Sequence, residues 1–151
     1  MNQRLSQKDL GDPALTLAGF QLWIHGREFP EAEDYYDGNW LRVTAHCAAV
    51  GADVWAQGSI LMTPDIEQFG AQCELLLQGE GTTAILAPLE PDLRIAIETV
   101  DHIGHLRVRV EITPDHLAQS HRMEFDIDQS YLPEIIRSCT VIVEEYSIRG
   151  Q

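Results

Sequence analysis

The sequence predicts an α+β domain made mostly of antiparallel strands, a sheet or sandwich of about seven strands with two helices. Several short segments alternate apolar and polar residues, as do strands with one buried and one wet face. Two longer segments carry apolar residues at spacings of three and four, which is typical of amphipathic helices. The length of 151 residues suits one domain with a self-sufficient core. We therefore expect a single globular domain over residues 14–151, preceded by a flexible lead-in at 1–13.

The expected strands are bounded by glycine, proline or acidic turn residues. The alternation is clearest in the segment 105–112, where Leu106, Val108 and Val110 are separated by charged residues. The segment 15–24 is rich in aliphatic and aromatic residues and is too short for a helix, so it is expected to be the first strand. The strands are predicted at 15–24, 40–49, 54–62, 83–87, 92–99, 105–112 and 121–127.

Two helices are predicted, at about 64–78 and 131–145. Thr63 and Pro64 suit the start of the first helix, as a cap and a first helical residue. Leu132, Ile135 and Cys139 begin the apolar stripe of the second. The β-branched run at 139–143 is equally compatible with a terminal strand on propensity alone.

The composition is strongly acidic, with 24 Asp and Glu against 10 Lys and Arg and a formal net charge of −14. Direct binding to nucleic acid is not expected, because phosphate backbones require a basic footprint. Such a charge attracts basic partners, although it also serves solubility alone. No apolar run has the length of a membrane span and the first residues lack a signal-peptide pattern, so we expect a cytoplasmic protein. Cys47, Cys73 and Cys139 lie at apolar positions and are expected to be buried free thiols.

No established catalytic or phosphate-binding motif is present, so no enzymatic activity and no cofactor are predicted. His102 and His105 have a spacing that two metal ligands could use, but a predicted hairpin loop without cysteines favours solvated histidines over a metal site. The acidic residues near position 34 match neither a calcium loop nor a separated glycosidase pair. A site assembled from scattered residues such as His46 and His121 has no positive support.

The most unusual segment is 28–39, which carries five carboxylates, two tyrosines and a proline between two predicted strands. Aromatic anchors surrounded by carboxylates are common in interaction surfaces, where the rings supply buried area and the charges steer the partner. The simpler alternative is that Trp40 and one tyrosine belong to the core. Our hypothesis for the partner-binding residues is Glu31, Glu33, Asp34, Tyr35, Tyr36, Asp37 and Trp40.

The order of several elements resembles a known family. These are Asp34-Tyr-Tyr-Asp-Gly-Asn-Trp-Leu41, the Thr63-Pro64 helix start, and Pro88-Leu-Glu-Pro-Asp-Leu93 before a strand. Together they resemble the WapI-type immunity proteins, small cytoplasmic bacterial antitoxins, over roughly residues 18 to 127. The resemblance implies a non-enzymatic protein that neutralises a cognate toxin domain, one that acts on tRNA in the WapI case. It assigns no toxin-contact residues, so the interface at 28–40 is a separate hypothesis.

The predicted function is therefore a protein-binding module of the immunity type, whose acidic surface captures a basic, nuclease-type toxin domain. The sequence leaves open the alternative of an uncharacterised homo-oligomeric or small-ligand-binding domain without a toxin partner.

Overall fold

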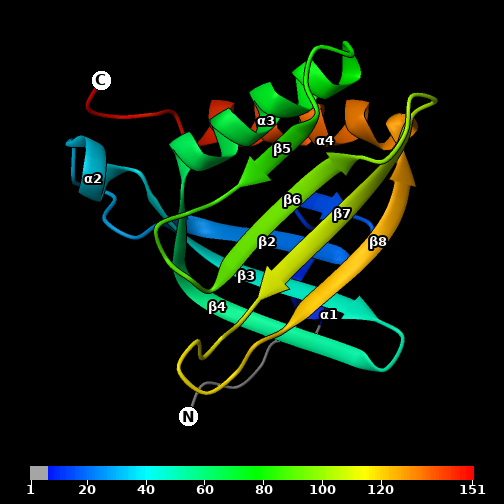
Figure 1. Ribbon diagram of the computed structural model, residues 1–151. Coiled ribbons are helices and arrows are strands. Elements are labelled where there is room, and N and C mark those ends of the chain that lie inside the picture. The colour runs from blue at the N-terminus through cyan, green and yellow to red at the C-terminus, as the bar shows by residue number, and fades with distance from the viewer. Residues whose placement is uncertain (1–6) are drawn as a thin grey trace.

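The computed structural model describes residues 7–151, which form two four-stranded antiparallel sheets and a pair of long helices (Figure 1). The strands of each sheet follow one another in chain order, so the first sheet is complete before the second begins. The first sheet contains β1 (Leu15–Leu17), β2 (Phe20–Arg27), β3 (Trp40–Ala49) and β4 (Ala52–Met62). The second contains β5 (Thr83–Leu86), β6 (Leu93–Thr99), β7 (His105–Ile112) and β8 (Arg122–Asp128).

The two long helices are α3 (Thr63–Leu77), which joins the sheets, and α4 (Leu132–Glu145), which follows β8 through the short 3-10 helix Gln129–Tyr131. They lie against each other in opposite directions at one end of the sheets (Figure 1). Two single-turn helices, α1 (Gln7–Leu10) and α2 (Tyr35–Gly38), lie in segments that the sequence analysis treats as irregular. The α+β class and both long helices are confirmed.

One predicted strand is in fact two. The chain reverses at Ala18 and Gly19, so the segment 15–24 forms the hairpin of β1 and β2, with Leu15 opposite Leu22. Ala18 has a φ of 52°, and the Gly19 carbonyl accepts a bond from the amide of Ala48 on β3. A tertiary hydrogen bond therefore stabilises a turn that is not evident from the continuous apolar run. Within residues 7–151 the two sheets hold eight strands.

The segment 139–143 is helical. Cys139 and Ile142 are buried, and both belong to the apolar cluster shared by the sheets and the helices. Helical spacing brings these side chains onto one face, and the burial of that face outweighs the modest helix propensity of β-branched residues. The start of α3 also differs in detail from the prediction. The Thr63 side chain makes no capping bond; instead the Asp65 carboxylate accepts from the amide of Met62 at 2.9 Å.

The core is continuous between the inner faces of both sheets and the helix pair. Strand β7 lies against β3 and β4, and α3 packs beside β5. The largest side chains without solvent contact come from both sheets and from α3, and they include Phe20, Leu22, Leu41, Phe69, Leu86 and Ile97. At the chain's beginning, the Trp23 indole donates to the Gly11 carbonyl at 2.9 Å and ties residue 11 to the first sheet. Residues 1–6 of the predicted lead-in lie outside the described residues.

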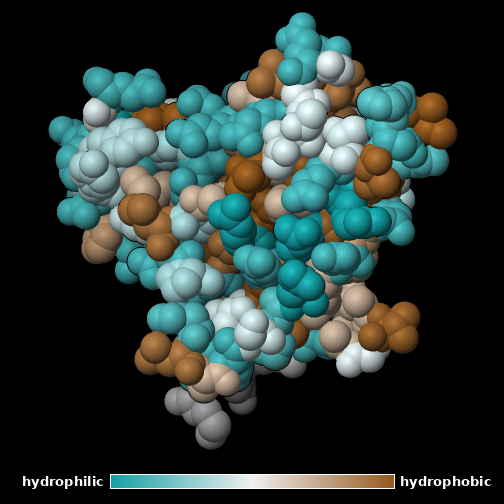
Figure 2. Space-filling model, in the orientation of Figure 1, coloured by the Kyte–Doolittle hydropathy of each residue, from teal (hydrophilic) through white to brown (hydrophobic). Residues whose placement is uncertain are grey.

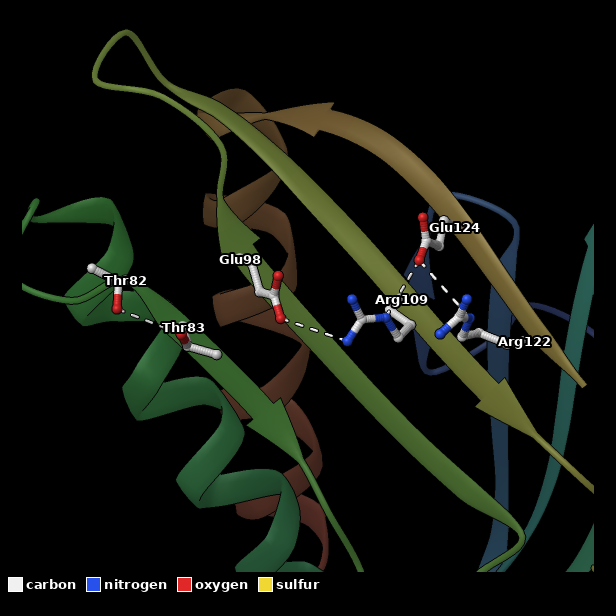
Figure 3. Close-up of polar contacts among 6 residues, drawn as sticks. All are labelled: Thr82, Thr83, Glu98, Arg109, Arg122 and Glu124. Carbon is white, nitrogen blue, oxygen red and sulfur yellow. Dashed lines mark hydrogen bonds and ion pairs between the residues drawn. The ribbon is translucent and has the colours of Figure 1, made fainter.

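The outer face of the β5–β8 sheet is polar, and hydrophilic side chains gather over it in Figure 2. Arg109 of β7 lies between Glu98 of β6 at 3.6 Å and Glu124 of β8 at 3.4 Å (Figure 3). Arg122 approaches Glu124 at 3.9 Å, and Arg107 approaches Asp126 at 3.8 Å. Exposed pairs of this kind contribute at most about 1 kcal/mol each, so their main consequence is a face of balanced charge. Among the described residues, no helix has both the length and the apolar character to cross a bilayer.

The burial of the three cysteine thiols predicts how the stability of the protein changes at high pH. All are free and buried, as expected from the sequence. Burial raises the pKa of Cys47 to about 11 and those of Cys73 and Cys139 to about 12, from the ordinary value of 9.0. Because these folded-state pKa values exceed the unfolded one, the neutral thiols contribute stability below pH 9.0, and that contribution is lost as the pH rises toward 12.

We expect the urea midpoint to fall as the pH rises above 9.0, and a thiol reagent at pH 8 to label the protein only after unfolding. Rapid labelling of the native protein would contradict the burial of these thiols. A sample unfolded in urea serves as the control and should expose all three thiols.

Candidate partner-binding surface

The segment 28–39, called the acidic loop below, connects β2 to β3 and contains α2. It projects beside the sheets, close to the C-terminus of the chain (Figure 1). Asp34 precedes α2, and its carboxylate accepts a hydrogen bond from the amide of Asp37 at 3.0 Å. This is the usual N-cap arrangement, in which a side-chain oxygen satisfies an amide that lacks a partner within the helix. The cap explains how a single turn forms in so polar a segment.

The C-terminal tail, residues 146–151, clamps the acidic loop through hydrogen bonds. The Arg149 guanidinium donates to the carbonyls of Pro30 at 2.7 Å and Ala32 at 2.8 Å. Arg27 of β2 donates to the carbonyls of Gly38 and Ser147, both at 2.6 Å. Both arginines therefore bind backbone oxygens of the loop and tail. Burial and the positive charge of Arg149 lower the pKa of Arg27.

Asn39 closes this clamp. Its side chain has no exposed surface, and its amide nitrogen donates to the carbonyls of Tyr35 at 2.7 Å and Arg149 at 3.0 Å. Its side-chain oxygen accepts from the Arg149 amide at 2.9 Å. Gly150 then passes so close that a Cβ there would lie 2.3 Å from the Tyr35 nitrogen, and its φ is 73°. Only glycine meets both conditions without strain.

The clamp divides the predicted binding residues into two groups. Glu31, Glu33, Asp34, Tyr36 and Asp37 are exposed, and the Tyr36 side chain is 67% accessible. Tyr35 and Trp40 are half-buried, and the Tyr35 ring meets that of Tyr36 edge-on with centroids 5.4 Å apart. The loop therefore brings the exposed residues together, whereas Trp40 lies at its base.

One exposed aromatic residue of the loop is missing from the predicted set. Phe29 is 47% accessible and lies between the strand end and Pro30. The sequence around Phe29 indicates its exposure, because it lies between Glu28 and a proline, and proline does not continue a central strand. Phe29 and Tyr36 are the large apolar side chains that this loop exposes.

Most carboxylates of the acidic loop, unlike those of the β5–β8 sheet, form no ion pair with a described cation. Within residues 7–151 no ion pair involves Glu31, Glu33 or Asp37, and the neighbouring Arg27 and Arg149 are engaged by carbonyls. Glu28 is the exception, since it accepts from the Ser59 hydroxyl at 2.7 Å and lies 3.9 Å from Arg42. The tip of the loop therefore presents negative charge that the protein does not neutralise locally.

The other candidate residues have structural roles in the part of the chain that is described. His105 is the first residue of β7, and its Nδ1 lies 2.5 Å from the carboxylate of Asp101 in the preceding loop. His46 is nearly buried, binds Gln21 and Asp53, and stacks on Trp55 at 4.0 Å. His121 approaches Gln119 in a different loop. No group of three or more potential metal ligands occurs among residues 7–151.

These elements define the class of the molecule: a small α+β protein with two antiparallel sheets, a helix pair and a clamped acidic loop at its surface. The chain belongs to the immunity protein WapI-like family, whose model matches residues 14–147. The match confirms the family resemblance and extends it to the end of α4. No curated protein matches the chain.

Among solved structures, the chain is similar to one from the CdiA-CT/CdiI toxin and immunity complex from Enterobacter cloacae. The identity is 10%, the TM-score is 0.43, and the match covers 68% of this chain and 89% of the other. This likeness is distant, and the assignment depends on the family match.

The clamp can be tested by substituting its buried amide. Asn39→Ala leaves the backbone groups of Arg149 without their partners, and we expect a loss of about 2–3 kcal/mol in the free energy of unfolding. Hydrogen exchange should accelerate at 34–38 and 147–150 more than in the sheets. Gln119→Ala, which removes an exposed amide, is the control. Equal exchange in both variants would show that Asn39 does not hold the tail against the loop.

Proposed function

We propose that this protein is an immunity protein that binds and neutralises a toxin domain, and that the acidic loop forms part of the interface. Membership in the WapI-like immunity family is the observation that carries the toxin-neutralising role. It also supports a non-enzymatic mode of action, in which binding alone blocks the toxin. The proposal places the protein in the cytoplasm, where reducing conditions keep free cysteines as thiols.

The chemistry of the loop supports a basic partner. Glu31, Glu33 and Asp37 carry no local counter-ion among the described residues, so a cationic surface would supply their charge partners. Phe29 and Tyr36 offer apolar area between these charges. Aromatic side chains dominate many interface energies, whereas peripheral carboxylates raise the rate of encounter and fix the orientation.

The proposal further specifies a nuclease-type toxin. A nuclease must bind the phosphates of its substrate, so its active surface carries Lys and Arg. An acidic loop that is already ordered would occupy that surface at a small entropic cost, because the clamp holds it before binding. The inhibitor would thus present carboxylates where the substrate presents phosphates.

The direct test is protection of cells by co-expression. Where a toxin domain is encoded beside this gene, that domain is expressed with and without the protein, and growth is measured. We expect restored growth and a complex that is stable at low salt and weaker at high salt. Continued toxicity, together with the absence of a complex in light scattering, would reject the immunity function. The same toxin domain inactivated in its active site gives the growth baseline.

The role of the acidic loop is tested by neutralising its charges. In the combined variant Glu31→Gln, Glu33→Gln, Asp34→Asn and Asp37→Asn, asparagine at 34 preserves the helix cap. We expect toxin affinity to fall by roughly 10- to 100-fold, mainly through slower association, and its salt dependence to weaken. The matched control neutralises Asp12, Glu80, Glu90 and Asp115, which are exposed elsewhere. Unchanged affinity in the loop variant would exclude the loop from the interface.

A further inference from the structure

A groove runs along the seam between α3 and α4, on the side of the helix pair away from the core. Its volume is about 280 Å³. The apolar part of its wall comes from Gly70 and Ala71 of α3 and from Ile136 and Val143 of α4. We call this surface the helix groove. It is separate from the acidic loop in sequence, and no part of the proposed function so far uses it.

The groove exists because small residues face larger ones across the seam. A Cβ on Gly70 would lie 2.9 Å from the Cβ of Cys139, so glycine allows the two helices to approach closely there. Ala71, one residue later, is exposed and leaves space above this contact. On α4, Ile136 and Val143 pack against the core cluster but remain only partly buried. The apolar face of α4 is therefore wider than the area that α3 covers.

The described charged side chains that line the groove are all acidic. Glu67 and Glu74 of α3 and Glu144 of α4 line it, and among the described residues no lysine, arginine or histidine does. The whole of α3, Thr63–Leu77, contains Asp65, Glu67 and Glu74 and no basic residue. No ion pair within residues 7–151 involves Glu67, Glu74 or Glu144. An apolar floor with an acidic border fits a ligand that has an apolar face flanked by cations.

We propose that the helix groove docks a basic amphipathic helix of the toxin partner, an inference that rests on the proposed immunity function. A groove between two antiparallel helices accepts a third helix whose apolar residues recur at spacings of three and four. A second copy of this chain fits poorly, because its own acidic helix pair would bring carboxylates against carboxylates. A basic helix instead gains a charge partner for each border residue.

The groove and the acidic loop also adjoin, which allows one partner to reach both. The amide of Thr63, at the start of α3, donates to the carbonyl of Asn39 at the end of the acidic loop. The tail that leaves α4 is bound to Arg27 beside the same loop. Glu67 is near the start of α3 and Glu144 is near the end of α4, so both belong to the helix ends that are connected to the loop and the tail. Together the two surfaces form one acidic region around this corner.

The test fills the groove without changing its charge. Ala71→Trp places an indole over the apolar floor, and Gln68→Trp places the same side chain on an exposed position of α3 outside the groove. The first probe is a peptide of leucine and lysine, with leucines at spacings of three and four; a peptide of the same composition in scrambled order is the control. NMR titration should shift the amides of Gly70 and Ala71 and give at least tenfold weaker binding to Ala71→Trp than to Gln68→Trp.

The second probe is the toxin domain itself, with the same pair of variants. If wild-type protein and Gln68→Trp bind the toxin domain but Ala71→Trp binds at least tenfold more weakly, the groove belongs to the interface. Equal toxin binding by both variants would overturn the inference while leaving the immunity function intact. If the wild-type protein binds no toxin domain, the immunity function and this inference both fail. Peptide shifts centred away from the helix groove would also overturn the inference. Thermal melting of both variants confirms that each is folded.

Discussion

Asn39 connects three parts of the molecule that are distant in sequence. Its side chain binds the turn of α2 and the backbone of Arg149, and its carbonyl accepts the first amide of α3. A buried carboxamide with all of these bonds satisfied holds its neighbours in one arrangement, because any displacement leaves a polar group unpaired in the interior. The position of the acidic loop, the path of the C-terminal tail and the start of the helix pair all depend on this residue.

Charged side chains are paired with opposite charges on one face of the protein and are unpaired on others. Arg107, Arg109 and Arg122 are paired with carboxylates on the outer face of the β5–β8 sheet, which is therefore close to neutral. Arg27 and Arg149 are engaged by backbone carbonyls near the loop. Much of the remaining negative charge lies on the acidic loop and the helix pair, and the rest is spread over other loops. A net charge that is spread evenly serves solubility, whereas one concentrated beside exposed aromatic and apolar side chains also suits a basic partner.

Elements with one buried face are recognisable in the amino-acid sequence. The alternation in β6, β7 and β8 and the apolar stripes of α3 and α4 predict these elements correctly, because one-sided burial imposes its period on the sequence. The reversal at Ala18 and Gly19 escapes prediction, since both arms of that hairpin are apolar and the turn is stabilised by β3. The exposure of Phe29 is a property of the folded chain, although Pro30 directly after it is a local sign that the strand does not continue there.

The sequence by itself determined the α+β class, the two long helices, the acidic character and the unusual segment at 28–39, since composition and periodicity are local properties. Tertiary structure alone decided that Asn39 and Gly150 hold this segment against the C-terminal tail, 110 residues away in the case of Asn39 and Arg149. It also decided that Trp40 lies at the base of the loop while Tyr36 is exposed, and that Glu67 and Glu144 border one groove. These outcomes depend on contacts between segments far apart in the chain, and such contacts leave no periodic trace in the amino-acid order.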